Sequence, residues 1–508
     1  MKAFSRKRTL LVVFVLALIL AVSAACNGGG DDPAPTAPTP APAPTVAPDD
    51  PPPPPPAEDP TEAPADEAPA SAAVGGIHQP RDLGGAVLTS AMWWEGGLAY
   101  AMSGPMDEEP DPATSTNYFR DRMIWDNARR VEQEFNMSFG NYVSPGSMEI
   151  IPSLTASVMA GEAMADLVIM EGWFLMSAVQ GDLILPLDQI DLPGSDLLGP
   201  RNYTRPSAEG FGHMWSFNTA SLDANAVAMG VNLDIINAIG APNPQDLYNQ
   251  GLWTWEAMLD IMRTATTDTT GDGLIDQWGI AGQPGEILRN FIGSNDGSLA
   301  TDDFEYAFDH PNTMEALEFM NAILSEGLWY SDPAQEVATW DWGRNFFAFE
   351  LGNAAFFPSA TWAIDDRSPL AFEFAIVPVP TGPSNTSGAT WLGGWRQGYT
   401  IPVAGAWDPA DVLMIVEEVF SWSGDEHDLL SDGAVASARA VFLTEECVQN
   451  QLAATHTMRS DMGYNVPEYP WQLDRFVNAF IAGEMTVAQA VETYRGPLQE
   501  MLDNFRQD

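Results

Sequence analysis

The chain of 508 residues is poor in cysteine, histidine and lysine, and these shortages exclude several kinds of site. Its two cysteines, Cys26 and Cys447, form no CxxC pair or Cys/His cluster, so a zinc site built on cysteine is excluded. The five histidines are scattered along the chain. No segment matches GxSxG, HExxH, GxGxxG or GxxxxGKS/T, so no motif indicates a serine hydrolase, a zinc protease, a dinucleotide site or a P-loop.

Lysine is absent after Lys7, and every later basic residue is arginine. The formal charge is -49, and loss of the four basic residues among the first eight would make it -53. A field of this sign repels nucleic acid and anionic lipid, and it disfavours a polyanionic ligand. An acidic surface without lysine also suits high salt or low external pH, in which case the charge says nothing about the ligand.

The N-terminus has the pattern of a secretory signal. Basic residues precede an unbroken apolar run of thirteen residues, Leu10 to Val22, and small residues follow it. A transmembrane helix needs about 20 apolar residues, so this run is short for one. We therefore predict a signal peptide over residues 1–25, the alternatives being an uncleaved membrane anchor or a plain cleaved signal.

The end of this segment, Val22-Ser-Ala-Ala-Cys26, resembles the lipobox of bacterial lipoproteins, although Ser23 stands where that family usually has Leu. The resemblance implies cleavage before Cys26 and a lipid on its sulfur. The protein would then be anchored at the extracellular face of the cytoplasmic membrane, or in the periplasm. An acylated Cys26 would also leave Cys447 without a disulfide partner.

Residues 26–75 are expected to form a stalk. From about Asp31 to Ala70 the chain is mostly Pro, Ala, Thr and acidic residues, a composition that cannot bury a core and favours extended polyproline II. A Pro-rich ligand for a recognition domain is the alternative. The remaining 430 residues or so are about twice the usual size of one domain, which predicts two lobes.

This folded part alternates strand-like and helix-like segments, which predicts an α/β fold with parallel strands. The hydrophobic spacing and the capping residues place the elements. Expected strands are 86–92, 137–143, 166–170, 354–357 and 374–378. Expected helices are 118–135, 150–159, 254–264, 313–326, 342–351 and 408–422, with a last helix from Thr486 that Pro497 breaks or kinks.

Four stretches together look like the extracellular solute-binding proteins that serve ABC importers, in the large sugar-binding group. Their order and spacing over about 400 residues carry the resemblance more than any single match does. The stretches are 156–170, 243–256 with 267–279, 349–357 with Trp362, and 374–382 with 393–395.

The resemblance implies a two-lobed α/β fold of the periplasmic-binding-protein type, with a hinge between the lobes. Lobe 1 would hold residues 76–227 plus about 378–445, and lobe 2 would hold 228–377 plus about 446–508. The protein would be a monomer that captures a small solute, a mono- or oligosaccharide being favoured, and delivers it to ABC permease subunits. Neither an enzymatic activity nor an organic cofactor is implied.

A sugar presents apolar ring faces and a rim of hydroxyl groups, so its site needs aromatic side chains and hydrogen-bonding groups. Such residues stand where strands meet loops, several of them where the resembling family reaches its ligand. The candidates are Trp94, Glu95, Glu171, Trp173, Trp362, Trp391, Trp395 and Arg396. Any one tryptophan could instead serve packing, as we expect of Trp255 and Trp342, while Trp340 and Asp341 stay open.

The segment from Asp268 has the spacing of an EF-hand calcium loop. Oxygen ligands fall at its positions 1, 3, 5, 7 and 9, and Gly273 is at position 6. These are Asp268, Thr270, Asp272, the Leu274 carbonyl and Asp276. Position 12 is Gly279 instead of Glu, so one ligand would come from elsewhere. A structural Ca²⁺ is predicted, and an acidic turn without metal is the alternative.

Three other functions stay open. A surface enzyme acting on glycosides would use paired carboxylates, but 70 acidic residues make any pair uninformative. The stalk alone would also suit a structural or adhesive lipoprotein. A solute-binding protein rich in tryptophan could hold a quaternary ammonium compound through cation–π contacts.

Overall fold

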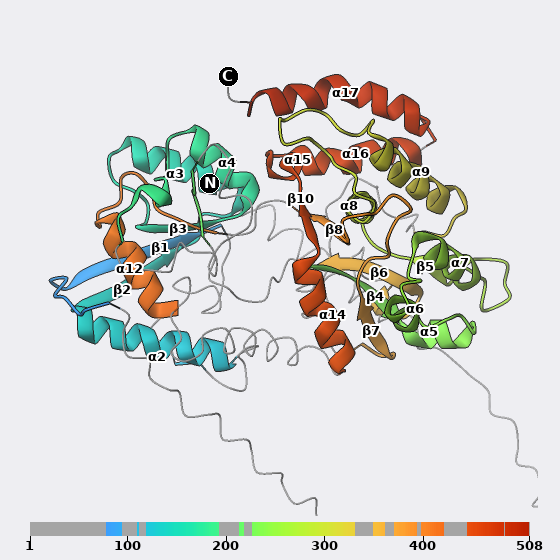
Figure 1. Ribbon diagram of the computed structural model, residues 1–508, viewed down its shortest axis with the longest axis horizontal. Helices are drawn as coiled ribbons and strands as arrows, with labels where there is room; N and C mark the ends of the chain where they lie inside the picture. The colour runs from blue at the N-terminus through green and yellow to red at the C-terminus, as the bar shows by residue number, and fades with distance from the viewer. Residues whose placement is uncertain are drawn as a thin grey trace, which may run out of the picture. The chain divides into compact units, whose positions relative to one another are not determined.

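A computed structural model describes most of the chain after residue 77. The described residues are 78–93, 109–110, 118–192, 213–217, 226–330, 349–360, 370–393, 398–420, 444–481 and 483–506. They form alternating helices and strands with two four-stranded sheets and one two-stranded sheet, which confirms the predicted α/β class (Figure 1). Cys26, the signal segment and the stalk lie outside them. No helix among the described residues is long and apolar enough to cross a membrane.

Lobe 1 is built on a sheet with the strand order β2-β1-β3-β9. Its strands are β1 (Ala86–Met92), β2 (Met137–Val143), β3 (Leu167–Met170) and β9 (Gly398–Thr400). The first three are parallel, and β9 runs antiparallel to β3. The lobe therefore joins the early part of the chain to a segment more than 200 residues later.

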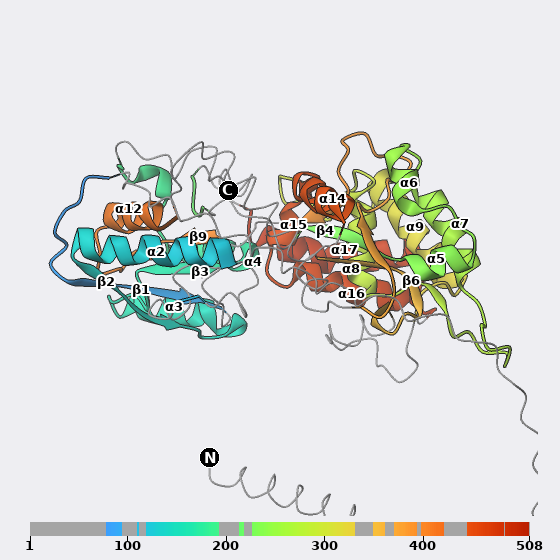
Figure 2. The same ribbon diagram turned by 90° about the horizontal axis from the view of Figure 1, so that it is seen from below.

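Helices cover both faces of this sheet because its strands alternate their apolar side chains between the two. On one face, Leu88 and Met92 pack with α2 (Tyr118–Phe135) and α12 (Pro409–Phe420). On the other, Ala91 packs with α3 (Ile150–Met159) and α4 (Gly172–Gln180). Figure 2 shows α2 and α12 on one side of the strands and α3 on the other. Two short 3-10 helices, Ser147–Glu149 and Leu187–Gln189, complete the lobe.

Lobe 2 is built on a second sheet, with the order β5-β6-β4-β7. Its strands are β4 (Val227–Asn232), β5 (Trp278–Ile280), β6 (Ala354–Ala360) and β7 (Phe374–Val377). Helix α14 (Glu445–His456) covers one face, where Val448 packs on Ala228 and Ile376. Beside this sheet, β8 (Trp391–Gly393) pairs in parallel with β10 (Met458–Ser460).

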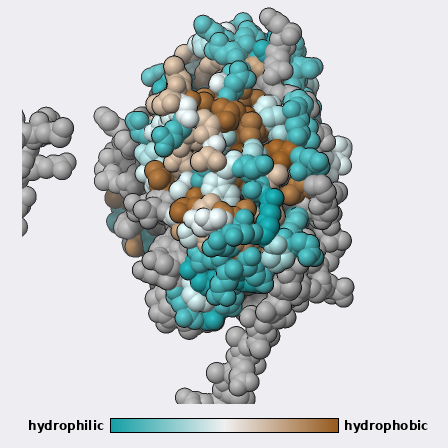
Figure 3. All heavy atoms as spheres, turned by 90° about the vertical axis from the view of Figure 1, so that its left-hand side faces the viewer, coloured by the Kyte–Doolittle hydropathy of each residue, from teal (hydrophilic) through white to brown (hydrophobic). Residues whose placement is uncertain are grey.

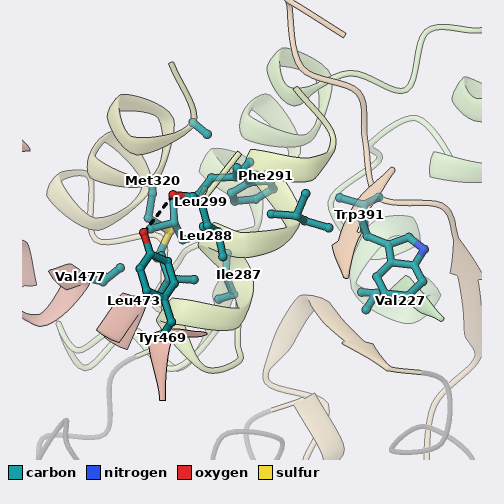
Figure 4. Packing of buried hydrophobic residues seen from close by; sticks show 14 of the residues in the cluster. Val227, Ile287, Leu288, Phe291, Leu299, Met320, Trp391, Tyr469, Leu473 and Val477 are labelled. Carbon is teal, nitrogen blue, oxygen red and sulfur yellow. Dashed lines mark hydrogen bonds between the residues drawn. The ribbon is translucent and has the colours of Figure 1, made fainter. Parts of the chain in front are cut away.

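The remaining helices of lobe 2 enclose its main core. They are α5 (Leu233–Ala238), α6 (Pro244–Asn249), α7 (Trp255–Ala265), α8 (Pro284–Gly293), α9 (Pro311–Ser325), α15 (Met462–Asn465), α16 (Tyr469–Ile481) and α17 (Val487–Asp503). Figure 4 shows α8 within this core, with Leu299, Met320 and Tyr469 beside it. The Tyr469 hydroxyl donates to the Leu299 carbonyl at 3.0 Å.

Capping residues fix several helix starts, and one prediction about them was wrong. Thr254 caps α7 by accepting from the Ala257 amide at 3.3 Å, as predicted. Helix α9, however, begins at Pro311 instead of Thr313, because the fixed φ of proline suits the first helical position. Pro497, predicted to break or kink the last helix, does not end it, because α17 continues through it.

The structure places residues 378–393 with lobe 2, not with lobe 1 as the resemblance suggested. The Thr381 amide donates to the Trp253 carbonyl at 3.2 Å, and the Gly382 amide donates to the Ser294 carbonyl at 2.8 Å. Strand β8 pairs with β10 of the same lobe. From Gly398 on, in β9, the chain is again part of the sheet of lobe 1.

The surface of lobe 1 is not uniformly charged, in spite of the acidic composition. Figure 3 shows apolar side chains among hydrophilic ones on one face of the molecule. Large apolar residues of lobe 1 that are exposed include Val87, Val143, Met148, Met159 and Val403. Exposed apolar residues are normal on soluble proteins, and nothing in the structure shows what would cover these.

Candidate functional site

The candidate site begins where β3 ends in lobe 1. All four residues of β3 are buried, and Glu171 follows them in an extended conformation as the N-cap residue of α4. Its side chain makes no capping hydrogen bond. Because partial burial removes water from the carboxyl, the pKa of Glu171 rises to about 8. At neutral pH Glu171 is therefore mostly a neutral acid, which can donate as well as accept a hydrogen bond.

Trp173 lies in the first turn of α4 and is partly buried. Its ring meets Phe174 edge to face, at 5.9 Å between centroids. It also meets Tyr464 of α15 at 6.2 Å with an interplanar angle of 45°. Since α4 belongs to lobe 1 and α15 to lobe 2, this aromatic contact joins the lobes next to Glu171.

A buried aspartate holds α15 in place. Asp461 is the N-cap residue of α15 and accepts from the Gly463 amide at 2.8 Å. It also accepts from the Leu299 amide at 2.8 Å and the Ala300 amide at 3.3 Å. Burial raises the pKa of Asp461 to about 6, although these three amides oppose the rise. The position of Tyr464 thus depends on a carboxyl that ties α15 to the rest of lobe 2.

Arg289 of α8 packs against the ring of Tyr464. Its guanidinium carbon is 4.5 Å from the centroid of the Tyr464 ring, a cation–π contact. Arg289 is buried and forms an ion pair with Glu286 one turn earlier on the helix. Burial raises the pKa of the Tyr464 hydroxyl to about 12, with Arg289 opposing the rise. Tyr464 therefore keeps its proton throughout the physiological range.

The N-terminus of α8 is capped by a carboxyl from α16. Asp474 accepts from the Gly285 amide at 3.1 Å and from Nε2 of Gln283 at 2.8 Å. Burial raises the pKa of Asp474 to about 7, and the charge of Glu286 adds to the rise. We call one set of residues the interlobe cluster: Glu171, Trp173, Gln283, Gly285, Glu286, Arg289, Tyr464 and Asp474.

The predicted ligand residues have different outcomes. Glu171 and Trp173 lie together in the interlobe cluster. Trp391, in contrast, is 3% exposed and donates from its indole N–H to the Ala454 carbonyl at 2.8 Å. It therefore packs inside lobe 2, which corrects its prediction as a ligand residue. The other candidates, Trp94, Glu95, Trp362, Trp395 and Arg396, lie outside the described residues, as do Trp340, Asp341 and Trp342.

Trp255, which we expected to serve packing, does so. It is 5% exposed, it stacks on Phe319 at 4.5 Å, and its indole N–H donates to the Ser294 hydroxyl at 3.1 Å. One face and the polar edge of its ring are therefore occupied by lobe 2 itself.

Sequence reasoning missed Tyr464, Arg289 and Glu286. Tyr464 gives no local signal, because it lies in a four-residue helix about 290 residues after Glu171. Arg289 does give one. Together with Asn290 it interrupts a run of apolar residues from Ile287 to Ile292. A charged residue inside such a buried run is rare unless it is paired, and it often marks a site.

The Asp268 loop turns its carboxylates toward its own backbone. Asp268 accepts from the Gly271 amide at 2.7 Å and the Gly273 amide at 2.6 Å. Asp276 accepts from the Thr269 amide at 2.8 Å. These bonds lower the pKa of both aspartates, the largest contributions being from Gly273 and Thr269. No three acidic, histidine or cysteine side chains converge as a metal site in the described part of the chain. The Ca²⁺ site stays a prediction.

Comparison with known proteins gives the chain its relatives. The family model described as bacterial extracellular solute-binding protein matches residues 132–404. No curated protein matches the chain.

Solved structures match over most of the chain. A cyclic alpha-maltosyl-1,6-maltose binding protein from Arthrobacter globiformis is 18% identical, with a TM-score of 0.58 over 83% of this chain and 100% of its own. An ABC substrate-binding protein from Listeria monocytogenes, in complex with cycloalternan, is 12% identical, with a TM-score of 0.57 over 82% and 99%. A maltose/maltodextrin-binding domain from Bdellovibrio bacteriovorus, bound to maltotriose, is 14% identical, with a TM-score of 0.53 over 82% and 100%. At such identities the similarity shows the fold, and it confirms the predicted two-lobed fold of the periplasmic-binding-protein type.

Proposed function

Because the chain belongs to the family of bacterial extracellular solute-binding proteins, we propose that it captures a mono- or oligosaccharide between its lobes for an ABC importer. Members of such a family hand their solute to membrane permease subunits, which are the proposed partners here. The observation that carries the proposal is the contact of Trp173 with Tyr464 beside Glu171. The solved structures named above, whose descriptions mention maltose-type and cyclic sugars, support the choice of ligand.

The chemistry of the interlobe cluster suits a neutral sugar. The aromatic rings of Trp173 and Tyr464 offer flat apolar surfaces to the CH faces of a pyranose. Glu171 and the Tyr464 hydroxyl, both protonated at neutral pH, can each donate and accept, as a sugar hydroxyl does. An anionic solute would meet the charge of Glu286 and of the acidic chain as a whole.

Calorimetry with a panel of solutes tests the proposal. Maltotriose, maltotetraose, cycloalternan, glycine betaine and a tripeptide are titrated into the full chain. We expect heat with at least one of the sugars, and an increase in melting temperature, since a ligand at 100 times its Kd stabilises by about 2.7 kcal/mol. Binding of betaine or the peptide alone would overturn the sugar assignment, and release of reducing sugar would indicate an enzyme.

A pair of tryptophan variants tests the place of binding. Trp173→Ala should weaken the sugar by roughly 30-fold, since removing a central aromatic contact costs about 2 kcal/mol. Trp278→Ala is the matched control, because Trp278 is also partly buried and also meets an aromatic ring, that of Tyr330 at 4.7 Å. It should leave the Kd unchanged. Equal losses in both variants would show an indirect effect of stability.

The membrane anchor is a separate part of the proposal. We propose that residues 1–25 are removed and that Cys26 carries lipid, on the strength of the lipobox-like segment. Wild-type protein expressed in a bacterial host should then sediment with membranes and partition into detergent. Cys26→Ser should be released, whereas Cys447→Ser should stay. Retention of Cys26→Ser would mean that an uncleaved signal holds the protein.

A further inference from the structure

Helix α8 carries buried polar atoms whose hydrogen-bonding capacity is unused. Asn290 is 1% exposed, and neither its amide nitrogen nor its amide oxygen has a partner. Nε of Arg289 and Oε1 of Gln283 are also buried without a partner. An unpaired buried polar group destabilises a fold, so native proteins keep few of them, and each calls for an explanation.

Helical spacing places Asn290 beside the interlobe cluster. Asn290 is four residues after Glu286 and three before Gly293, so the three share one face of α8. A Cβ on Gly293 would lie 2.3 Å from the Leu392 amide, which shows that this face meets β8. The adjacent residues Ile287, Leu288 and Phe291 fill the core instead (Figure 4). Asn290 therefore lies between Glu286 and β8.

We propose that Asn290 and Nε of Arg289 form a subsite for hydroxyl groups of the bound solute. The inference rests on the proposed sugar-binding function. It adds which atoms of the protein would hold hydroxyl groups of the sugar. On this proposal the solute reaches the subsite past Tyr464, which packs on the Arg289 guanidinium and meets Trp173 of lobe 1. Separation of α4 from α15 when the lobes open would uncover it.

The unpaired atoms of Asn290 and Arg289 determine which kinds of solute can form hydrogen bonds with them. The Asn290 amide needs one acceptor and one donor, and Nε of Arg289 needs an acceptor. Hydroxyl groups supply all of these, because each both donates and accepts. A carboxylate or phosphate only accepts, so it would leave the Asn290 oxygen unpaired. An apolar solute would leave every atom unpaired. The subsite therefore fits a neutral polyhydroxylated compound.

Asn290→Leu tests the subsite, because leucine has nearly the same shape and no polar atoms. In calorimetry with the sugar that the wild type binds, the variant should bind about 10- to 100-fold more weakly, the effect expected when a buried hydrogen bond is lost. Its melting temperature without sugar should stay the same or rise, since unpaired polar atoms have been removed. If the variant does not fold, Asn290→Ala makes the same test.

Asn295→Leu is the matched control for stability. Asn295 is also buried, but its amide donates to the Asn312 carbonyl and to Oε2 of Glu315, both at 2.8 Å. Its oxygen accepts from the Ser384 amide at 2.8 Å. This variant should therefore melt at a lower temperature, opposite to Asn290→Leu.

Deoxy analogues of the same sugar complete the test. Loss of the hydroxyl held by Asn290 should weaken binding to the wild type and not to Asn290→Leu. If Asn290→Leu melts higher and binds every analogue as the wild type does, the Asn290 amide makes no contact with the sugar, and the subsite is refuted while the proposed function stands. If no sugar binds the wild type, the proposed function fails and the subsite falls with it.

Discussion

Glu171 gives the sharpest test of the interlobe cluster, because burial shifts its pKa strongly. The pKa rises from 4.5 to about 8, and loss of water is the only cause. In the variant Glu171→Gln the side chain keeps its size and cannot ionise. At a pH where Glu171 is ionised in the unfolded wild type but protonated in the folded wild type, ionisation stabilises the unfolded state. The variant cannot ionise, so it should be more stable than the wild type at such a pH.

The sign and size follow from proton linkage. Below pH 4.5 both states of the wild type carry the proton, so the stability contributed by Glu171 does not depend on pH. Between pH 4.5 and 8 the unfolded state releases its proton first, so the wild type loses stability as the pH rises. Since one pKa unit equals 1.36 kcal/mol, the loss has a ceiling of about 5 kcal/mol at pH 8. Glu171 is only partly buried, and with solvent screening we expect about 2–3 kcal/mol.

Urea unfolding from pH 4.5 to pH 9 measures this difference, with each transition fitted separately. The difference between Glu171→Gln and the wild type should grow through this range and level off above pH 8. Glu162→Gln, at an exposed position after α3, is the control for replacing a carboxyl by an amide. A constant difference for Glu171→Gln, or one that shrinks as the pH rises, would refute the argument that Glu171 is held neutral by burial.

Three further predictions concern other parts of lobe 2. Gly293→Ala would place a Cβ 2.3 Å from the Leu392 amide, so it should lower the free energy of unfolding by at least ~2 kcal/mol in urea titrations. Thr486→Ala removes half of the capping box that Thr486 forms with Gln489, so it should cost about 1 kcal/mol, and the double variant with Gln489→Ala should lose less than the sum of the single losses. Added Ca²⁺ should raise the melting temperature and EDTA should lower it, an effect that Asp268→Asn abolishes; an unchanged melting curve would refute a structural ion in that loop.

Local pattern was enough to predict most of lobe 1. The limits of β1, β2, α2 and α3 match those read from the sequence, because each element shows a clear apolar period and ends at a capping or breaking residue. The start of α9 was misjudged where two rules compete. Asn312 precedes the expected start at Thr313, and Asn is a favoured N-cap residue. Pro311, however, is already in the first turn, and Asn312 instead donates to the Asp296 carbonyl at 3.4 Å.

The route of the chain between the lobes could not be read in the same way. Residues 378–393 look like a strand-and-turn segment that either lobe could accept. Their place is decided by bonds to Trp253, Ser294 and Ala454, which lie between 60 and 130 residues away along the chain. No periodicity carries such information. The same limit applies to Tyr464, whose role depends on its contact with Trp173 from the other lobe.

Departures from pattern, in contrast, carry functional information that the pattern itself does not. In α8, Arg289 and Asn290 stand in a helix that otherwise fills a core, where leucine at either position would satisfy the local rules and remove unpaired atoms. Glu171 likewise leaves its helix uncapped and is held neutral at a strand end, where a serine would cap α4. Each choice makes the isolated fold less stable. On the proposed function, a solute whose hydroxyl groups pair with these atoms would restore that stability only when it is bound. The residues that weaken the empty protein would then provide its affinity for the solute.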